Sequence, residues 1–573
     1  MGLSVGLDTA VKALRAHQLA VDVASHNIAN AQTPGFSRQR VLLRPIGIDG
    51  SDHFTRDNLL GRAGMGVDAK DVNRIRDTFL DFQARQGISS QGQYAALATP
   101  MSNAEVVFND PSDDGISALL AKFWAAWHDV VNEPESSPAR TALVHATTTF
   151  TLRLQTAHSQ LEQQRQDLNH TVRGIGEEIN AKATEIAALN LQIKQVELNG
   201  DMANDLRDRR DVLLDGLSSL GNISYAEDES GSMSVYLGTH ELVFGTSART
   251  VNAVDDPSNP GMVTLQFAID NDEVSVGSGQ LRGVLDARDV ALPDLIAKLN
   301  NFATGLMNSV NSVHQAGYGL DNATGLAFFT GTDASDIAVN AAISGSPQSI
   351  ATSTGPGQPG NPGNALAIAN LEQAPNMLAG LGANNLVVNE ALSAGNVASG
   401  ISLAGSLQPG TYHLVAAGPN VELRQGSATG PVVGTATLAN INPPGGAITF
   451  TNGTGTVATI SMSVGAGYSA AAQLADLTSA GNNILQVEHS ASTFYGNLVS
   501  VLGADVNRAN GLEDSAGLLV DHLDTLRQSV HGVNIDEEVT NLNSAQHAYS
   551  AAAKVISVID DMLDTLINRT GVG

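Results

Sequence analysis

The C-terminal segment of the chain carries apolar side chains at a strict seven-residue interval, and this repeat constrains the fold more than any other feature. Two series, offset by three residues, contain Ile535, Leu542, Tyr549, Ile556 and Leu563, and then Ala545, Ala552, Ile559 and Leu566. An apolar stripe of this spacing forms the seam of a coiled coil. Asn534 followed by Glu537 resembles a capping box, so the helix is expected to begin at Ile535.

The N-terminal segment repeats the pattern. Leu7, Leu14, Val21 and Ile28 lie seven residues apart and predict an amphipathic helix. Isolated helices with one apolar stripe are only marginally stable in water, so we expect the two ends of the chain to pair. The sequence leaves two arrangements open, which are a helical hairpin within one chain and a bundle of helices from identical subunits.

A specific stretch, "ASHNIANAQTPGFSRQR" at 24–40, follows the first helix. Asn27 and Asn30 are expected to end the helix, because asparagine tolerates the left-handed conformation of a helix stop. Pro34 and Gly35 suit the two central positions of a type II turn. A helix terminator alone does not require the aromatic ring of Phe36 or the positive charges of Arg38 and Arg40, which follow the turn.

The segments between the chain ends alternate in pattern. Helical spacing marks 116–131 and 154–196, whereas 222–285 and 401–464 alternate short apolar runs with turns, as β domains do. The predicted fold class is a multidomain α+β protein, with a coiled-coil-like helical stalk built from both chain ends and inserted, mainly β domains. The expected division is a terminal helical core at 1–45 and 531–573, a helical bundle layer at 46–221, 280–320 and 484–530, a first β domain at 222–279, and a second, variable β-rich domain at 321–483 with a Pro/Gly linker at 353–365.

Composition excludes several classes of function. A formal net charge of -28 opposes binding to nucleic acid or to anionic membrane surfaces, and no apolar run is long enough to span a membrane. The chain has no cysteine, which removes thiolate metal sites and cysteine nucleophiles. Asp8, Lys12 and Arg15 interrupt the place where a cleaved signal peptide needs an apolar core. We find no catalytic, cofactor-binding or metal-binding motif, and expect no enzyme activity.

The stretch "NIANAQTPGFSRQ" resembles the N-terminal signature of bacterial flagellar axial proteins, the family of rod, hook and hook-associated subunits. Its Ser37-Arg38-Gln39 continuation is similar to the hook-associated members rather than to the hook or rod subunits. Further agreement in order and position is found in "FWAAWHDVVNEPESSPAR" (Phe123–Arg140), "NDLRDRRDVLLDGLS" (Asn204–Ser218), "GQLRGVLDARD" (Gly279–Asp289) and the block Gly532–Asn568. The resemblance covers roughly 1–320 and 485–573, whereas 335–480 matches no pattern of the family.

The resemblance implies a structural protein that joins hook to filament as a homo-oligomeric ring. It implies export of the unfolded chain by the flagellar type III apparatus, an extracellular location, and contacts with the hook protein and a second junction protein. An export chaperone would bind the C-terminal helix. The expected assembly residues are Asn27, Asn30, Thr33, Pro34, Gly35, Phe36, Ser37 and Arg38 at the N-terminus, and Leu542, Tyr549, Ile556, Ile559, Leu563 and Leu566 on the C-terminal helix, which the chaperone would also cover.

Two alternatives stay open at this point. A hook or distal-rod subunit would share the terminal helices, although the Ser37-Arg38-Gln39 run and the long C-terminal half argue against it. A surface adhesin could use the β region 401–464 to bind glycans. Residues 335–480 are poor in His, Asp and Glu, which disfavours a grafted hydrolase.

Overall fold

The computed structural model describes residues 2–46, 66–198, 200–373, 386–388, 397–405, 410–417, 420–425, 432–437, 447–451, 456–464, 484–487 and 490–565. The chain forms two compact units. The first contains Met1–Ala98, Asp167–Ala287 and Ala509–Gly573, and the second contains Thr99–Gln166 and Arg288–Arg508. Long helices and several antiparallel sheets confirm the predicted multidomain α+β class.

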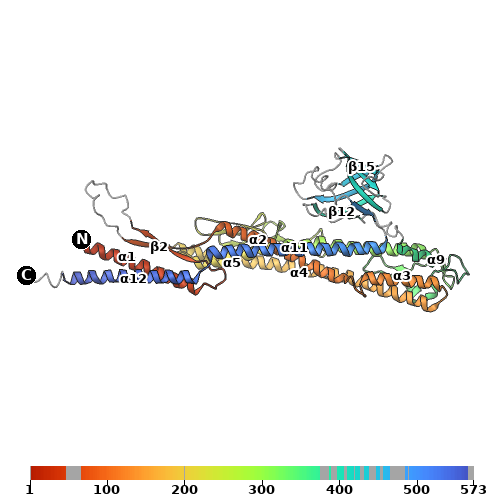
Figure 1. Cartoon of the computed structure of the whole chain (residues 1–573), viewed down its shortest axis with the longest axis horizontal. Helices are drawn as coiled ribbons and strands as arrows, with labels where there is room; N and C mark the ends of the chain where they lie inside the picture. The colour runs from red at the N-terminus through yellow and green to blue at the C-terminus, as the bar shows by residue number, and fades with distance from the viewer. Residues whose placement is uncertain are drawn as a thin grey trace, which may run out of the picture. The chain divides into compact units, whose positions relative to one another are not determined.

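The two terminal helices lie side by side in the first unit (Figure 1). Helix α1 spans Gly2–Ala29 and helix α12 spans Ile535–Asp564. Gly6 of α1 faces α12, because a Cβ atom on this glycine would lie 3.5 Å from Cδ1 of Ile559. On α12 the predicted stripe supplies the contact, because Ala552 and Ile559 are buried. Of the two arrangements that the sequence left open, this chain shows the intramolecular pair.

The rest of the first unit is a helical body with a small β layer. Its elements are the hairpin β1 (Gln39–Pro45) and β2 (Val67–Arg74), the first part of α2 (Thr78–Phe108), the later part of α4 (Ser137–Glu197), α5 (Asn204–Leu220), β3 (Ile223–Glu227), β4 (Met233–Leu237), β5 (His240–Phe244), β6 (Ser247–Ala248), β7 (Val251–Asp255), β8 (Val263–Phe267), α6 (Gln280–Asp286) and the end of α11 (Ala491–His531). Strands β3 to β6 form one antiparallel sheet in sequence order. Alternate residues of β4 are buried, so one face of this sheet joins a core with α4 and α5.

The second unit is built around α3 (Ile116–Asn132) and α7 (Leu292–His314). Phe123 and Trp127 of α3 form an aromatic cluster with Phe150, Phe302 and Phe328. The smaller elements are the π-helix η1 (Ala287–Ala291), which begins in the first unit, β9 (Phe329–Thr330), β10 (Ala338–Val339), α8 (Ala341–Gly345), η2 (Pro347–Ser349), α9 (Gly363–Ala369) and η3 (Asn370–Gln373). Together they form a helical body, with the aromatic rings in its core.

An eight-stranded antiparallel sheet also belongs to the second unit, in the order β11-β18-β13-β14-β15-β16-β17-β12. Its strands are β11 (Leu386–Val388), β12 (Val397–Gly405), β13 (Gly410–Ala417), β14 (Asn420–Gln425), β15 (Val432–Thr437), β16 (Ala447–Thr451), β17 (Thr456–Val464) and β18 (Ile484–Val487). The edge strands β11 and β12 also contact each other. The predicted β character of 401–464 is therefore confirmed for the described strands.

Three segments differ from the sequence prediction. Residues 484–487, assigned to the helical layer, form strand β18 instead, and 491–531 form a single helix, α11. Residues 321–373 form turns and short helices, and their only named strands are the two-residue β9 and β10. The segment 353–365 is no linker, since Ser353 is buried and Asn364 donates its backbone N–H to the carbonyl of Thr352. The segments assigned to one helical layer are shared between both units. Periodicity could not anticipate this, because α2, α4 and α11 each continue from one unit into the other.

Candidate functional site

The Thr33-Pro34-Gly35 turn lies at the end of α1 and packs against α5. The Phe36 N–H donates to the carbonyl of Thr33 over 3.2 Å, and Gly35 has φ 77°, which confirms the predicted type II turn. A Cβ atom on Gly35 would lie 2.2 Å from Cγ2 of Val212. Glycine is therefore required twice here, by the left-handed backbone and by the close approach of α5.

Asn27 has a different role from the predicted one. Neither Asn27 nor Asn30 has a positive φ, and Asn27 lies buried inside α1, which continues to Ala29. Its amide oxygen accepts the backbone N–H of Gln39 over 3.0 Å, and its Nδ2 donates to the carbonyl of Gln39 over 2.9 Å. The side chain thus continues the hydrogen bonding of β1 onto the helix. The sequence suggested a helix stop because this long-range partner is visible only in the fold.

The two ends of the chain meet at Glu538, in the first turn of α12. Its carboxylate is buried and accepts Nε of Arg38 over 2.7 Å and Nδ2 of Asn27 over 3.0 Å. Arg38 also pairs with Glu537 at 2.9 Å. Asn534 caps the helix by accepting the N–H groups of Asp536 and Glu537, which confirms the predicted helix start. The N-terminal motif therefore holds the beginning of α12 by charge-assisted hydrogen bonds.

Ser37 and Gln39 attach the motif to α5. The Ser37 hydroxyl donates to Oδ1 of Asp208 over 2.7 Å, and its backbone N–H donates to Oδ2 over 2.9 Å. Gln39 Nε2 donates to Asp205 over 2.8 Å. Thus "SRQ" bridges two elements, with Ser37 and Gln39 bound to α5 and Arg38 bound to α12.

Next to the motif lies a set of mostly buried charged side chains, which we name the arginine–aspartate cluster. It contains Arg74, Arg76, Arg85 and Arg527, together with Asp81, Asp208, Asp211 and Asp215. Asp211 is its centre, since its carboxylate lies 2.7 Å from Nη1 of Arg74, 2.7 Å from Nη1 of Arg76 and 3.1 Å from Nη2 of Arg85. The cluster joins β2, α2, α5 and α11, so it fixes the base from which the terminal helices emerge.

Electrostatics favour the charged forms in this cluster. Burial alone would raise the pKa of Asp211, but the guanidinium groups of Arg76, Arg74 and Arg85 lower it to about 2. Burial opposes the charge of Arg85 as well, yet Asp215 and Asp211 raise its pKa above the usual value. The pKa of the neighbouring His531 is lowered, first by burial and then by Arg76. The site is an ion-pair network that stays charged at neutral pH.

The predicted site residues fall into two groups in the structure. Asn27, Ser37 and Arg38 come together around Gln39, Glu538 and Asp208, whereas Leu542, Tyr549, Ile556, Ile559 and Leu563 lie farther along α12. Leu566 lies outside the described residues. Neither Glu538 nor the arginine–aspartate cluster was predicted as part of the site from the sequence. A signal existed for α5, because Asp208, Asp211 and Asp215 recur at helical spacing within "NDLRDRRDVLLDGLS".

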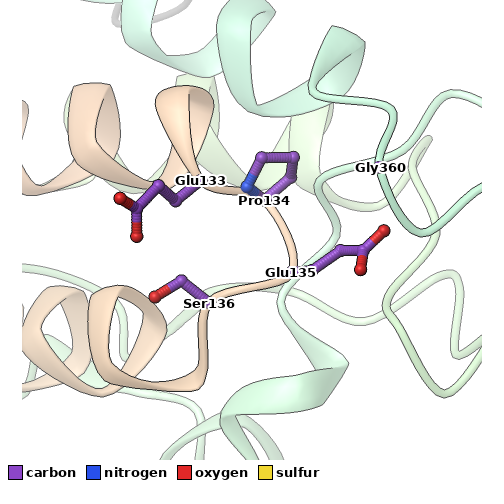
Figure 2. Close-up of a pocket in the computed structure, with 5 residues that line it drawn as sticks. All are labelled: Glu133, Pro134, Glu135, Ser136 and Gly360. Carbon is purple, nitrogen blue, oxygen red and sulfur yellow. The ribbon is translucent and has the colours of Figure 1, made fainter.

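This arrangement is suited to holding elements together rather than to catalysis. The cluster carboxylates are bound to guanidinium groups, which leaves them poor general bases. A shallow opening in the second unit lies between α3, α4 and the loop at Gly360 (Figure 2). There the carboxylates of Glu133 and Glu135 point away from each other and do not form an acid–base pair (Figure 2).

One group within the described residues has metal-ligand spacing. Ligand atoms of His240, Asp270 and Asp272 lie within 4.8 Å of one another. His240 already pairs with Asp272 at 3.0 Å, and Asp270 accepts the backbone N–H of Asp272. Both aspartates are exposed, so the group is explained as the polar rim of a hairpin. In the described part of the chain, no helix is both long and apolar enough to cross a bilayer.

Protein-family models match both terminal helices and a large part of the chain between them. The family model "Flagella basal body rod protein" matches residues 7–36, and "Flagellar basal body rod FlgEFG protein C-terminal" matches 529–569. The model "Flagellar hook-associated protein FlgK helical domain" matches 101–329. The fold and these matches define a structural axial component of the bacterial flagellum, which is not an enzyme.

Curated relatives indicate which kind of flagellar component the chain resembles. "Flagellar hook-associated protein 1" of Bacillus subtilis is 28% identical over 582 residues, covering 99% of each chain, and that of Escherichia coli is 24% identical over 600 residues, covering 98% of this chain and 99% of the relative. The chain is thus similar over almost its whole length to flagellar hook-associated proteins. A solved structure titled as the flagellar hook junction protein FlgK from Burkholderia pseudomallei is 19% identical, covers 74% of this chain and 66% of its own, and has a TM-score of 0.39, too low to bear on the fold.

Proposed function

We propose that this flagellar protein joins the hook to the filament as a ring of identical subunits. The supporting observation is an apolar row that α12 still exposes after pairing with α1. It contains Ala551, Val555, Val558 and Met562, spaced three and four residues apart on one helical face. Burial of this row against neighbouring subunits would stabilise a bundle of terminal helices, at roughly 25 cal/mol per Å² of apolar area removed from water.

The buried contacts at the motif give this role a mechanical basis. Glu538 and Asn27 hold the two terminal helices at their base, and the arginine–aspartate cluster holds that base to the helical body. A force on one end of the first unit is therefore transmitted through buried, charge-assisted contacts rather than through a flexible loop. A subunit that connects two different assemblies needs such a rigid joint.

Export and delivery complete the proposal. The unfolded chain would leave the cell through the flagellar type III apparatus, a route on which the absence of cysteine avoids unwanted cross-links. An export chaperone would cover Leu542, Tyr549, Ile556 and Leu563 before α12 pairs with α1. On the cell surface, the ring would contact the hook protein on one side and a second junction protein on the other.

The test of assembly is the double substitution Ile556→Asp and Leu563→Asp. It places charges on the stripe of α12, so the chain should remain folded in its second unit, bind no chaperone and be absent from flagella. The matched control is Ser550→Asp with Ser557→Asp, which alters two exposed positions one residue beyond the stripe on the same helix. Normal flagellar incorporation of the Ile556 and Leu563 variant would refute the proposal.

Location is tested by immunogold electron microscopy on intact bacteria, with an antibody against residues 335–480. A single band where hook meets filament supports the junction role. Label along the whole hook would make the chain a hook subunit instead. Label confined to the cell body would favour the adhesin alternative.

A further inference from the structure

A hollow beside the N-terminal motif has no role in the contacts described so far. It encloses about 390 Å³ between the Thr33-Pro34-Gly35 turn, α4 and α5. Pro34, Phe36 and Val212 give it an apolar lining, and Val212 is 47% exposed. An apolar cavity of ~150 Å³ accommodates benzene, so this hollow has room for more than one side chain.

The rim of the hollow is acidic. The side chains of Glu185 and Asp205 are 51% and 64% exposed, and both line the opening. Arg209 on the same rim contacts Glu185 at 3.7 Å, but its own side chain is 67% exposed. A ligand that combines an apolar side chain with a cationic one would match both the lining and the rim.

Strand β1 of the same protein carries that combination. Arg40, Leu42 and Arg44 alternate along one face of the strand, and all three side chains are exposed. The irregularity of the β1–β2 ladder adds a residue to β2 and leaves the alternation of β1 intact. Asp68 lies opposite Arg44 in the ladder, yet the two form no ion pair within the described residues.

A chain cannot fill its own hollow with this face. Gln39, the first residue of β1, is bound to Asp205 at the rim, and the strand is paired with β2 along its whole length. At 3.3–3.4 Å per residue, Arg44 lies roughly 17 Å farther along the strand. This face of β1 can therefore reach such a hollow only in another copy of the chain.

We propose that Leu42 and Arg44 of one subunit dock into the hollow of the next subunit, with Leu42 on the apolar lining and Arg44 at Glu185 and Asp205. The contact joins two different surfaces, so it is heterologous and propagates into rings or helical arrays. The inference rests on the ring proposed above and names one lateral contact within it.

The absence of cysteine makes site-specific cross-linking a clean test. The pair Pro45→Cys and Arg209→Cys places thiols on β1, next to Arg44, and on the rim. Flagella isolated from cells that carry this variant are treated with a short bis-maleimide. We expect a ladder of covalently joined chains, with at least tenfold more dimer than in the control pair Pro45→Cys and Arg282→Cys. Arg282 is an exposed arginine of the first unit that lies outside the hollow.

Charge reversal provides an independent measurement. Arg44→Glu should reduce the amount of chain in isolated flagella at least tenfold, and the added substitution Glu185→Arg should restore it. Chain that is present in flagella but cross-links no more than the control overturns this inference alone. Absence of the cysteine-free parent chain from isolated flagella overturns the proposed function and this inference together. Failure of Glu185→Arg to restore the Arg44→Glu variant contradicts the docking of Arg44 at this rim.

Discussion

Asp211→Asn is the most informative single change in the arginine–aspartate cluster. The substitution keeps the shape of the side chain and removes its charge. Three guanidinium groups, those of Arg74, Arg76 and Arg85, lie within 3.1 Å of this carboxylate and would lose their shared partner. Asp81, Asp208 and Asp215 stay in place, so the guanidinium groups are left only partly compensated.

Two routes give the magnitude. Removal of one partner from a buried ion pair costs about 3–5 kcal/mol. The pKa of Asp211 falls from 3.8 to about 2 because burial is outweighed by the three arginines, and at 1.36 kcal/mol per pKa unit this corresponds to roughly 2 kcal/mol. We therefore expect Asp211→Asn to destabilise the first unit by about 3 kcal/mol.

Amide hydrogen exchange in α5 measures this loss locally. A loss of about 3 kcal/mol corresponds to roughly 100-fold faster exchange at neutral pH. Because the folded-state pKa is below the unfolded value, the contribution of Asp211 is present above pH 3.8 and is lost as the pH falls through about 2. The difference between variant and parent should shrink over the same interval. Asp201→Asn, an exposed control, should change nothing. Exchange rates within fivefold of the parent, or a difference independent of pH, would refute the reasoning.

Two further predictions concern single residues. Gly35→Ala forces a Cβ atom against Val212 at a residue with positive φ, and it should destabilise the motif by more than about 1 kcal/mol. Hydrogen exchange at the end of α1 measures this loss. The added change Val212→Ala should relieve the clash with Val212 but leave the backbone strain at residue 35. His314 is buried, and burial first and Arg140 second lower its pKa from 6.5 to about 4, against the hydrogen bond to the Leu326 carbonyl. The neutral ring is favoured in the folded state, so the stability of the second unit should fall by roughly 3 kcal/mol as the pH drops from 6.5 to 4. Amide hydrogen exchange in α7, measured over this pH range, should show the fall in the parent protein and not in the His314→Gln variant.

Local patterns in the sequence were sufficient for much of the fold. The seven-residue series predicted α12, the Asn534 cap predicted its start, and Pro34-Gly35 predicted a type II turn that the backbone at Gly35 confirms. These features depend on interactions between residues three or four positions apart, so they can be identified from the sequence directly. The β pattern of 401–464 likewise depends on alternation within single strands.

The tertiary structure decided which residues share the site. Asn27 and Glu538 are 511 positions apart, and their hydrogen bond turns an expected helix stop into a joint between the chain ends. Asp211 gains three cationic partners from β2, α2 and the segment that joins them, so its charge is stabilised in a place where burial alone would oppose it. The sequence determined the helices and turns because local hydrogen bonds and side-chain spacing suffice for them. The buried charges required the fold, since a carboxylate is stable away from water only when distant parts of the chain bring cations within hydrogen-bonding distance.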